Sequence, residues 1–302
     1  MTTTPTENDN ALLGAAESGD TAAVARLLAA GADVHANDDH ALWAAAYFDH
    51  PDMVRVLVAA GANVHVNDDL ALCSAVAHSR AATVDALLDA GANVHANDGY
   101  ALWTAAGNDH AEICAALLDH GANVHVNGNA ALRVAAKDGY PTVARLLIKH
   151  GADVHSFDDE ALLTAAENGH TETCQVLISA GADVHAGHDA PLRNAANHGH
   201  TDIASLLLDA GADPMRAFPP AARLNNKAAP TLDAAMVATR SEHMADFRTA
   251  HPDEPLPLIT ARLAAHDVRA SLQRPARSPC PVPGAPRRHA AARPAVGDDL
   301  DH

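Results

Sequence analysis

The sequence predicts an all-α solenoid built from stacked pairs of short helices, and two observations support this prediction. Each repeating unit holds two short apolar stripes at helical spacing, separated by a polar turn. The units themselves return at a constant interval of 30 residues, and self-similarity at such a period is typical of stacked-repeat proteins. Each unit opens with Gly-Ala-Asp or Gly-Ala-Asn, at Gly31, Gly61, Gly91, Gly121, Gly151, Gly181 and Gly211.

Two helices are expected in each unit. In residues 31–60 the first has Leu42, Ala45 and Ala46 at i, i+3 and i+4, and the second places Leu57 on its buried stripe. The recurring glycine follows the second helix, where a left-handed cap is expected, so these glycines are predicted to be structural. Helices of about 8–10 residues are unstable alone in water, and only stacking can stabilise them.

The periodicity divides the chain into five parts. Residues 1–10 are expected to be disordered, and residues 11–30 to form a capping half-repeat. Six full repeats occupy residues 31–210. Residues 211–273 are expected to form a degenerate cap with a helical extension, and residues 274–302, rich in Pro, Ala and Arg, to be disordered. The solenoid is therefore predicted to carry a partly helical, partly disordered tail.

The charge is distributed unevenly along the 302 residues, whose formal net charge is −18. Residues 1–210 contain 8 Lys or Arg and 28 Asp or Glu, a net −20. An acidic repeat block repels phosphate, which argues against nucleic acid as a partner and favours a protein with a basic surface. Aromatic residues make up only 3%, so the core must consist mainly of Ala, Leu and Val.

Cysteine usage and hydropathy bear on location. Cys114 and Cys174 share a repeat position two units apart, roughly 20 Å if layers are about 10 Å apart, which no disulfide spans. A reducing cytoplasm is therefore the expected location, and we expect the chain to be a monomer. The polar N-terminus shows no secretory signal, and no apolar run approaches the roughly 18–20 residues that cross a bilayer. Export through an uncleaved C-terminal signal stays open.

The repeats resemble ankyrin repeats over about residues 11–215. Gly151–Val154, the pair Ala165–Ala166 and the turn Gly169–His170 stand where that family has its GADV, LHxAA and NGH signatures. The resemblance implies helix–turn–helix repeats with a concave face that binds other proteins. The family's unit has about 33 residues, so the three missing here indicate short or absent β-hairpins before each first helix.

The family's T-P-L-H segment is largely lost. Only Pro191 keeps its proline, and no repeat keeps its histidine. Trp43 and Trp103 occupy this column, and we expect them to fill space between repeats rather than contact a partner.

One histidine per repeat forms a ladder along the loops. A shared metal site is disfavoured, because rungs about 10 Å apart cannot both reach an ion at about 2.0–2.1 Å. The favoured interpretation is structural, with each side chain tying successive loops together; a response to pH near 6 stays open. The ladder consists of His35, His65, His95, His125, His155 and His185.

Other candidate sites favour structural roles. His50, His110, His170 and His200 are expected to pack in the turns between helices. The pairs Asp38–Asp39, Asp68–Asp69 and Asp158–Asp159 lack the spacing of an EF-hand and are expected to be solvated. The sequence shows no motif of a hydrolase, a zinc protease or a phosphate-binding loop. We therefore expect no enzymatic activity, no catalytic residue, no metal and no cofactor.

Two variable columns carry the candidate partner-binding residues. One precedes each first helix and the other follows the Ala pair, and in the resembling family both line the concave surface. Tyr47, Phe48 and Tyr100 are expected to anchor a partner, since tyrosine is a common interface residue. The full set is Asp39, His40, Tyr47, Phe48, Leu70, His78, Tyr100, Asn108, Lys137, Asp138, Glu160, Glu167, Asn168 and His198.

The sequence thus predicts a non-enzymatic scaffold or adaptor that binds a partner protein, with no membrane association. The alternative is a host-directed effector or regulatory subunit, in which the Arg-rich tail carries targeting or activity and the repeats select the partner.

Overall fold

The structure is a computed structural model that describes residues 6–217. The expected helical extension, the disordered tail and all but the start of the degenerate cap lie outside the described residues. Within residues 6–217 the regular structure is helical throughout, with no strand. The predicted all-α solenoid is confirmed, and so is the absence of β-hairpins from its loops.

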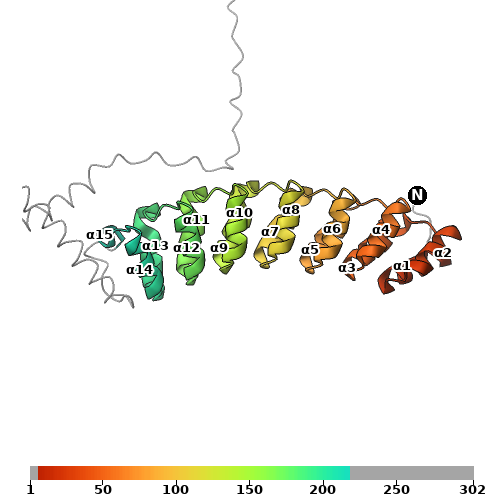
Figure 1. The fold of residues 1–302 in the computed structure, drawn as a ribbon, viewed down its shortest axis with the longest axis horizontal. Coiled ribbons are helices and arrows are strands. Elements are labelled where there is room, and N and C mark those ends of the chain that lie inside the picture. The colour runs from red at the N-terminus through yellow and green to blue at the C-terminus, as the bar shows by residue number, and fades with distance from the viewer. Residues whose placement is uncertain (1–5, 218–302) are drawn as a thin grey trace, which may run out of the picture. The chain divides into compact units, whose positions relative to one another are not determined.

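The helices alternate between two layers, and each contacts its neighbours within its own layer (Figure 1). The first layer contains α1 (Glu7–Ser18), α3 (Ala36–Tyr47), α5 (Leu70–Ala77), α7 (Ala96–Gly107), α9 (Val126–Asp138), α11 (Ser156–Asn168), α13 (Ala186–His198) and α15 (Pro214–Ala217). The second contains α2 (Thr21–Ala29), α4 (Pro51–Ala59), α6 (Ala81–Asp89), α8 (Ala111–Asp119), α10 (Pro141–Lys149), α12 (Thr171–Ser179) and α14 (Thr201–Asp209).

The core between the layers is a continuous row of leucines and alanines. Leu42 and Leu57, one from each helix of a repeat, are almost completely buried, and so are their counterparts in the following repeats. The Ala45–Ala46 pair is fully buried, because the small side chains let the neighbouring helices approach closely. Each repeat buries its apolar stripes only against its neighbours, so every junction contributes to stability.

A left-handed turn of three residues lies at the start of each first helix in the full repeats, within its bounds or, at α5, directly before it. Asn37, Asp38 and Asp39 have φ values of 53°, 57° and 52°, and the same turn recurs every 30 residues through 187–189. Asn, Asp and Gly adopt this conformation with less strain than other residues. They fill all of these positions except Phe157 and His188. The turn occupies the place where the resemblance to the ankyrin unit of about 33 residues would put a β-hairpin.

The N-terminus corrects one expectation. Residues 1–10 were predicted to be disordered, but α1 begins at Glu7 and is capped by Thr6. The Thr6 hydroxyl accepts a hydrogen bond from the Asp9 N–H at 3.3 Å, and the Asp9 carboxylate accepts one from the Thr6 N–H at 2.7 Å. This capping box orders the start of the stack.

Histidines in the inter-helix turns join consecutive repeats. His170 Nε2 donates to the Lys137 carbonyl at 2.9 Å, and His200 Nε2 contacts the Glu167 carbonyl in the same way. The His170 ring lies over Gly139, whose φ of +81° ends α9 in the left-handed conformation. No side chain fits between Gly139 and this ring.

We predict that Gly139→Ala destabilises the stack more than Gly151→Ala does. Both glycines have positive φ, which costs an alanine about 1–2 kcal/mol. A Cβ at Gly139 would lie only 2.3 Å from His170 Nδ1, whereas a Cβ at Gly151 meets nothing within 4 Å. Displacing the ring should add about 1–3 kcal/mol to the loss in free energy of unfolding, measured by urea denaturation. Equal losses in the two variants would show that the ring does not constrain the turn.

Candidate functional site

Hydrogen bonds from one repeat to the loop of the next tie the described stack together. At residues 9, 39, 69, 129, 159 and 189 an Asp or Asn side chain accepts the backbone N–H of the residue 24 positions on, at 2.7–2.9 Å. We call these residues, together with residue 99, the brace positions. All six of these side chains are buried, so each bond is shielded from water on the acceptor side, while its donor lies in a surface loop.

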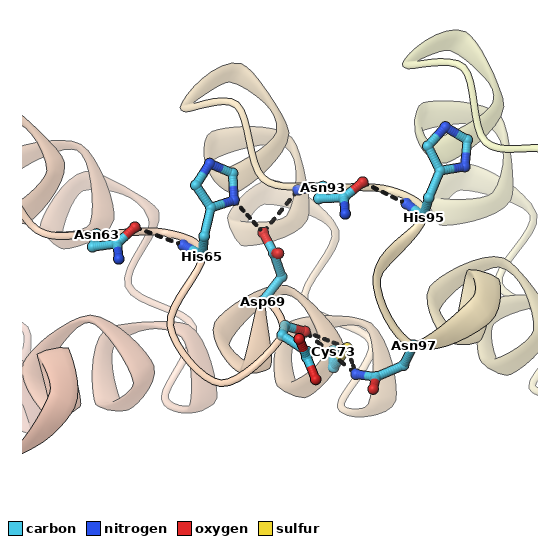
Figure 2. Close-up of polar contacts among 8 residues, drawn as sticks. Asn63, His65, Asp69, Cys73, Asn93, His95 and Asn97 are labelled. Atoms are coloured by element: carbon cyan, nitrogen blue, oxygen red, sulfur yellow. Dashed lines mark hydrogen bonds and ion pairs between the residues drawn. The ribbon is translucent and has the colours of Figure 1, made fainter.

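The ladder histidines orient these carboxylates (Figure 2). His65 Nδ1 lies 3.2 Å from Asp69 Oδ1, which also accepts the Asn93 N–H at 2.7 Å. His35, His155 and His185 contact their own aspartates at 2.8–3.1 Å. The histidine therefore bonds within its own repeat, and the Asp makes the link between loops.

These contacts correct two expectations. Asp39 was predicted to bind a partner, but it is 5% exposed and serves as a brace. The Asp pairs were expected to be solvated, yet the second Asp of each pair is buried while the first is exposed. The left-handed turn gives adjacent residues opposite environments, and the sequence does not show this.

The carboxylates at the brace positions differ electrostatically. At Asp9 the pKa is lowered, chiefly by the Asp33 N–H and then by the Thr6 cap. At Asp159 burial raises the pKa, although the Asp183 N–H and His155 act in the opposite direction.

Residue 99 is the exception, because it is a glycine. Neither the Asn123 N–H nor the His95 ring has a hydrogen-bond partner within residues 6–217. A cavity of about 210 Å³ lies at this junction, and its walls include Tyr100, Trp103 and Val126.

Large aromatic and apolar side chains gather along the first-layer helices α3, α5 and α7, some of them exposed and others half-buried. Rings follow one another along α3, with centroids 4.8 Å apart from His40 to Trp43 and 5.2 Å from Trp43 to Tyr47. Tyr47 also contacts His78 on α5, at 4.6 Å. We call the following residues the aromatic patch: His40, Trp43, Tyr47, Phe48, Leu70, His78, Tyr100 and Trp103.

Trp103 corrects a further expectation. It was predicted to fill space between repeats, but it is 47% exposed and lies 6.2 Å from the Tyr100 ring. The neighbouring repeats fill their core with Leu and Ala, which leaves no room for an indole. Phe48 and Tyr100, both predicted partner-binding residues, are 45% and 38% exposed.

Several other predicted site residues bond to their own helix. His78, Asn108, Asn168 and His198 share one column, and each side chain donates to the carbonyl four residues earlier at 2.8–2.9 Å. They thus cap the end of the first helix while remaining exposed. Lys137, Asp138 and Glu167 are exposed as well.

Glu160 lies in a separate cluster. Its carboxylate pairs with Arg133 at 3.1 Å, so its charge is partly neutralised. The same guanidinium stacks on the Phe157 ring, with Cζ 4.5 Å from the centroid. Phe157 is 64% exposed and was not predicted as a surface residue. Its position in an Asn, Asp and Gly turn was the available signal.

Two observations on the described residues concern their cysteines and possible metal ligands. Burial raises the pKa of the Cys114 and Cys174 thiols to about 12, so both stay protonated at neutral pH. Within residues 6–217 no three His, Cys, Asp or Glu side chains gather where they could hold a metal ion. No helix in this part of the chain could cross a bilayer.

The family follows from this repeat geometry and a direct match. A family model of ankyrin repeats matches residues 12–98, 72–158 and 155–217. The chain belongs to the ankyrin repeat family. Ankyrin repeats are in general protein–protein interaction modules, typically without enzymatic activity.

Solved ankyrin structures share the fold. The human ASB11 ankyrin repeat domain is 25% identical, with a TM-score of 0.57 over 67% of this chain and 98% of that chain. The ankyrin repeat domain of Bcl-3, a unique member of the IkappaB family, is 24% identical, with a TM-score of 0.56 over 66% and 97%. No curated protein matches the sequence.

We predict that Asp69→Ala lowers the free energy of unfolding by about 1–3 kcal/mol, because it removes the buried carboxylate that accepts the Asn93 N–H. Asp69→Asn is the matched control and should cost less, since Asn129 makes the same bond naturally. Chemical denaturation gives the stabilities, and amide hydrogen exchange at Asn93 reports the bond directly. Slow exchange at Asn93 in the Asp69→Ala variant would contradict the assignment.

We also predict that Cys114 and Cys174 resist thiol reagents in the folded chain. At pKa values of about 12, the thiolate fraction at pH 8 falls on the order of a thousandfold below that of a free cysteine. The measurement is labelling at pH 8 in a Cys280→Ser variant, with each site resolved by mass spectrometry. Labelling in urea is the control, and fast native labelling would show the thiols are accessible.

Proposed function

We propose that this ankyrin stack binds a partner protein through the aromatic patch, and that it acts as a scaffold or adaptor without catalytic activity. The observation that carries the proposal is the concentration of aromatic rings along α3 and α7, of which Phe48, Tyr100 and Trp103 are exposed while Trp43 and Tyr47 are half-buried. Trp43, Tyr47, Phe48, Tyr100 and Trp103 are five of the nine Phe, Tyr and Trp residues in the chain. Exposed apolar patches of this kind mark interaction sites on soluble proteins.

The patch suits an interface physically. Tyr and Trp bury large areas at a low cost in side-chain entropy, and they dominate binding hot spots. Tyr47 is already held in place by Trp43, Phe48 and His78, so little freedom remains to be lost on binding.

The charge around the patch favours a basic partner. Residues 31–120 contain two Lys or Arg and thirteen Asp or Glu, a net −11. Arg55, which pairs with Asp52 at 2.8 Å, is one of these two cations. An acidic field accelerates association with a basic surface, and salt weakens it. A monomer in a reducing compartment fits the free, buried Cys73, Cys114 and Cys174.

We predict that the triple variant Tyr47→Ala, Phe48→Ala, Tyr100→Ala weakens partner binding at least about 30-fold, or about 2 kcal/mol. The partner is a protein captured by the wild-type chain, and calorimetry then gives the affinities. Phe157→Ala, which removes an exposed ring outside the patch, is the matched control and should bind normally.

A second outcome tests the charge. Wild-type affinity should fall as salt rises from about 50 to about 300 mM. Full affinity in the triple variant, with its helical content and unfolding midpoint unchanged, would exclude the patch as the site.

A further inference from the structure

One junction of the described stack lacks its inter-repeat hydrogen bond. Asp69 accepts the Asn93 N–H one junction earlier, and Asn129 accepts the Asp153 N–H one junction later. Gly99 stands between them and offers no side chain, so the Asn123 N–H has no acceptor within residues 6–217. Asn123 lies at the surface, so its N–H is available to an acceptor from outside the chain.

A cavity occupies the place of the missing side chain. Its volume is about 210 Å³, and Gly99 and Asn123 both line it. A Cβ built on Gly99 would lie 3.4 Å from the nearest Val126 methyl, an ordinary contact distance, so the position is open to a side chain.

Among the described residues the His95 ring has no partner at the same junction, as is also true of the His125 ring one repeat later, where the brace residue is Asn129 and not a carboxylate. His35, His65, His155 and His185 each turn their Nδ1 to the carboxylate four residues on. Figure 2 shows His65 bonded to Asp69 and His95 at the corresponding place one repeat later. With Gly99 four residues after it, His95 has no carboxylate to contact.

We propose that this cavity, the Gly99 gap, binds an Asp or Glu carboxylate presented by the partner protein. The carboxylate accepts the Asn123 N–H and contacts His95, as Asp69 does for Asn93 and His65. The inference rests on the proposed function, since it takes the carboxylate from the protein that covers the aromatic patch. Tyr100 and Trp103 belong both to that patch and to the cavity wall.

The local charge permits this occupant. Asp98 lines the cavity and is exposed. In two earlier repeats a carboxylate at the brace position lies beside an aspartate equivalent to Asp98. These pairs are Asp39 with Asp38 and Asp69 with Asp68. The cavity is larger than a carboxylate, so the aromatic walls can hold an apolar residue beside the acid. A partner that is basic overall is attracted by the acidic charge around the patch. A single acidic side chain on that partner can still enter the Gly99 gap.

The test uses the full chain labelled with ¹⁵N and a blocked peptide, acetyl-Leu-Asp-Leu-amide. We expect the Asn123 amide proton to move downfield and to saturate, with a dissociation constant on the order of 1 mM. Acetyl-Leu-Ala-Leu-amide, which lacks the acceptor, should bind at least about tenfold more weakly. No movement at Asn123 with the Asp peptide would overturn the proposal.

Two variants make the test decisive. Gly99→Asp should supply the acceptor from the chain itself, move the Asn123 amide downfield without peptide and abolish the response. Asp69→Gly should open a gap one junction earlier, so that the Asn93 amide gains a response. This second variant still tests the inference if Gly99→Asp does not fold.

Failure here is distinguishable from failure of the proposed function. If the Asn123 amide does not shift with the peptide, only the acidic anchor is excluded. The proposed function is tested separately, by the affinity of the triple aromatic variant for the whole partner protein. Loss of partner binding in Gly99→Asp, with the aromatic patch intact, would support the acidic anchor independently.

Discussion

The three-residue left-handed turn is the constraint on which the rest of the stack depends. A 30-residue repeat leaves no room for a hairpin between the loop and the first helix, so the chain must reverse within residues such as 37–39. That geometry selects Asn, Asp and Gly. It also directs the third side chain of the turn to the next loop, where it accepts the backbone N–H. In the full repeats, strain and bracing are therefore parts of one element, whereas Asp9 makes the same bond from the capped first turn of α1.

Each junction combines this polar bond with apolar burial. Leucines from both helices and the alanine pair exclude water from the carboxylate. This strengthens the hydrogen bond that the carboxylate accepts from the loop N–H. The burial has its own electrostatic cost, visible in the raised pKa of Asp159. The histidine beside that carboxylate offsets part of the cost and stays exposed, which gives four of the six ladder histidines a structural role.

Much of the fold could be predicted because periodicity reports burial directly. The leucine and alanine columns and the polar turn between the helices followed from the 30-residue spacing, and the short or absent hairpins from the resemblance to the longer ankyrin unit. Asp39 was misplaced because sequence alone does not separate two adjacent acids when the backbone turns left-handed. The same period held an unused signal at the N-terminus, since Asp9 precedes Asp39 by 30 residues and makes the same bond.

The candidate site was predictable where a repeat carries a much larger side chain than the other repeats have at the same position. Tyr47, Phe48 and Tyr100 are aromatic residues at positions that vary from repeat to repeat. Trp103 was assigned to the interior because a large apolar residue is usually buried, yet the frame already fills that space with small residues. Gly99 escaped notice for the opposite reason, because a glycine among Asn and Asp looks like any other turn residue.

The coincidence of the Gly99 gap with Tyr100 and Trp103 links stability to recognition. The junction without its hydrogen bond is the one whose first helix exposes two rings. A partner that supplied the missing acceptor would complete the junction as well as bind to it, and the stack would then stiffen across α7 and α9. Binding energy would be divided between the new contact and the ordering of the repeats on either side. A solenoid with an acceptor at every brace position could still bind a partner through exposed rings. It would not couple that binding to the stiffening of a junction.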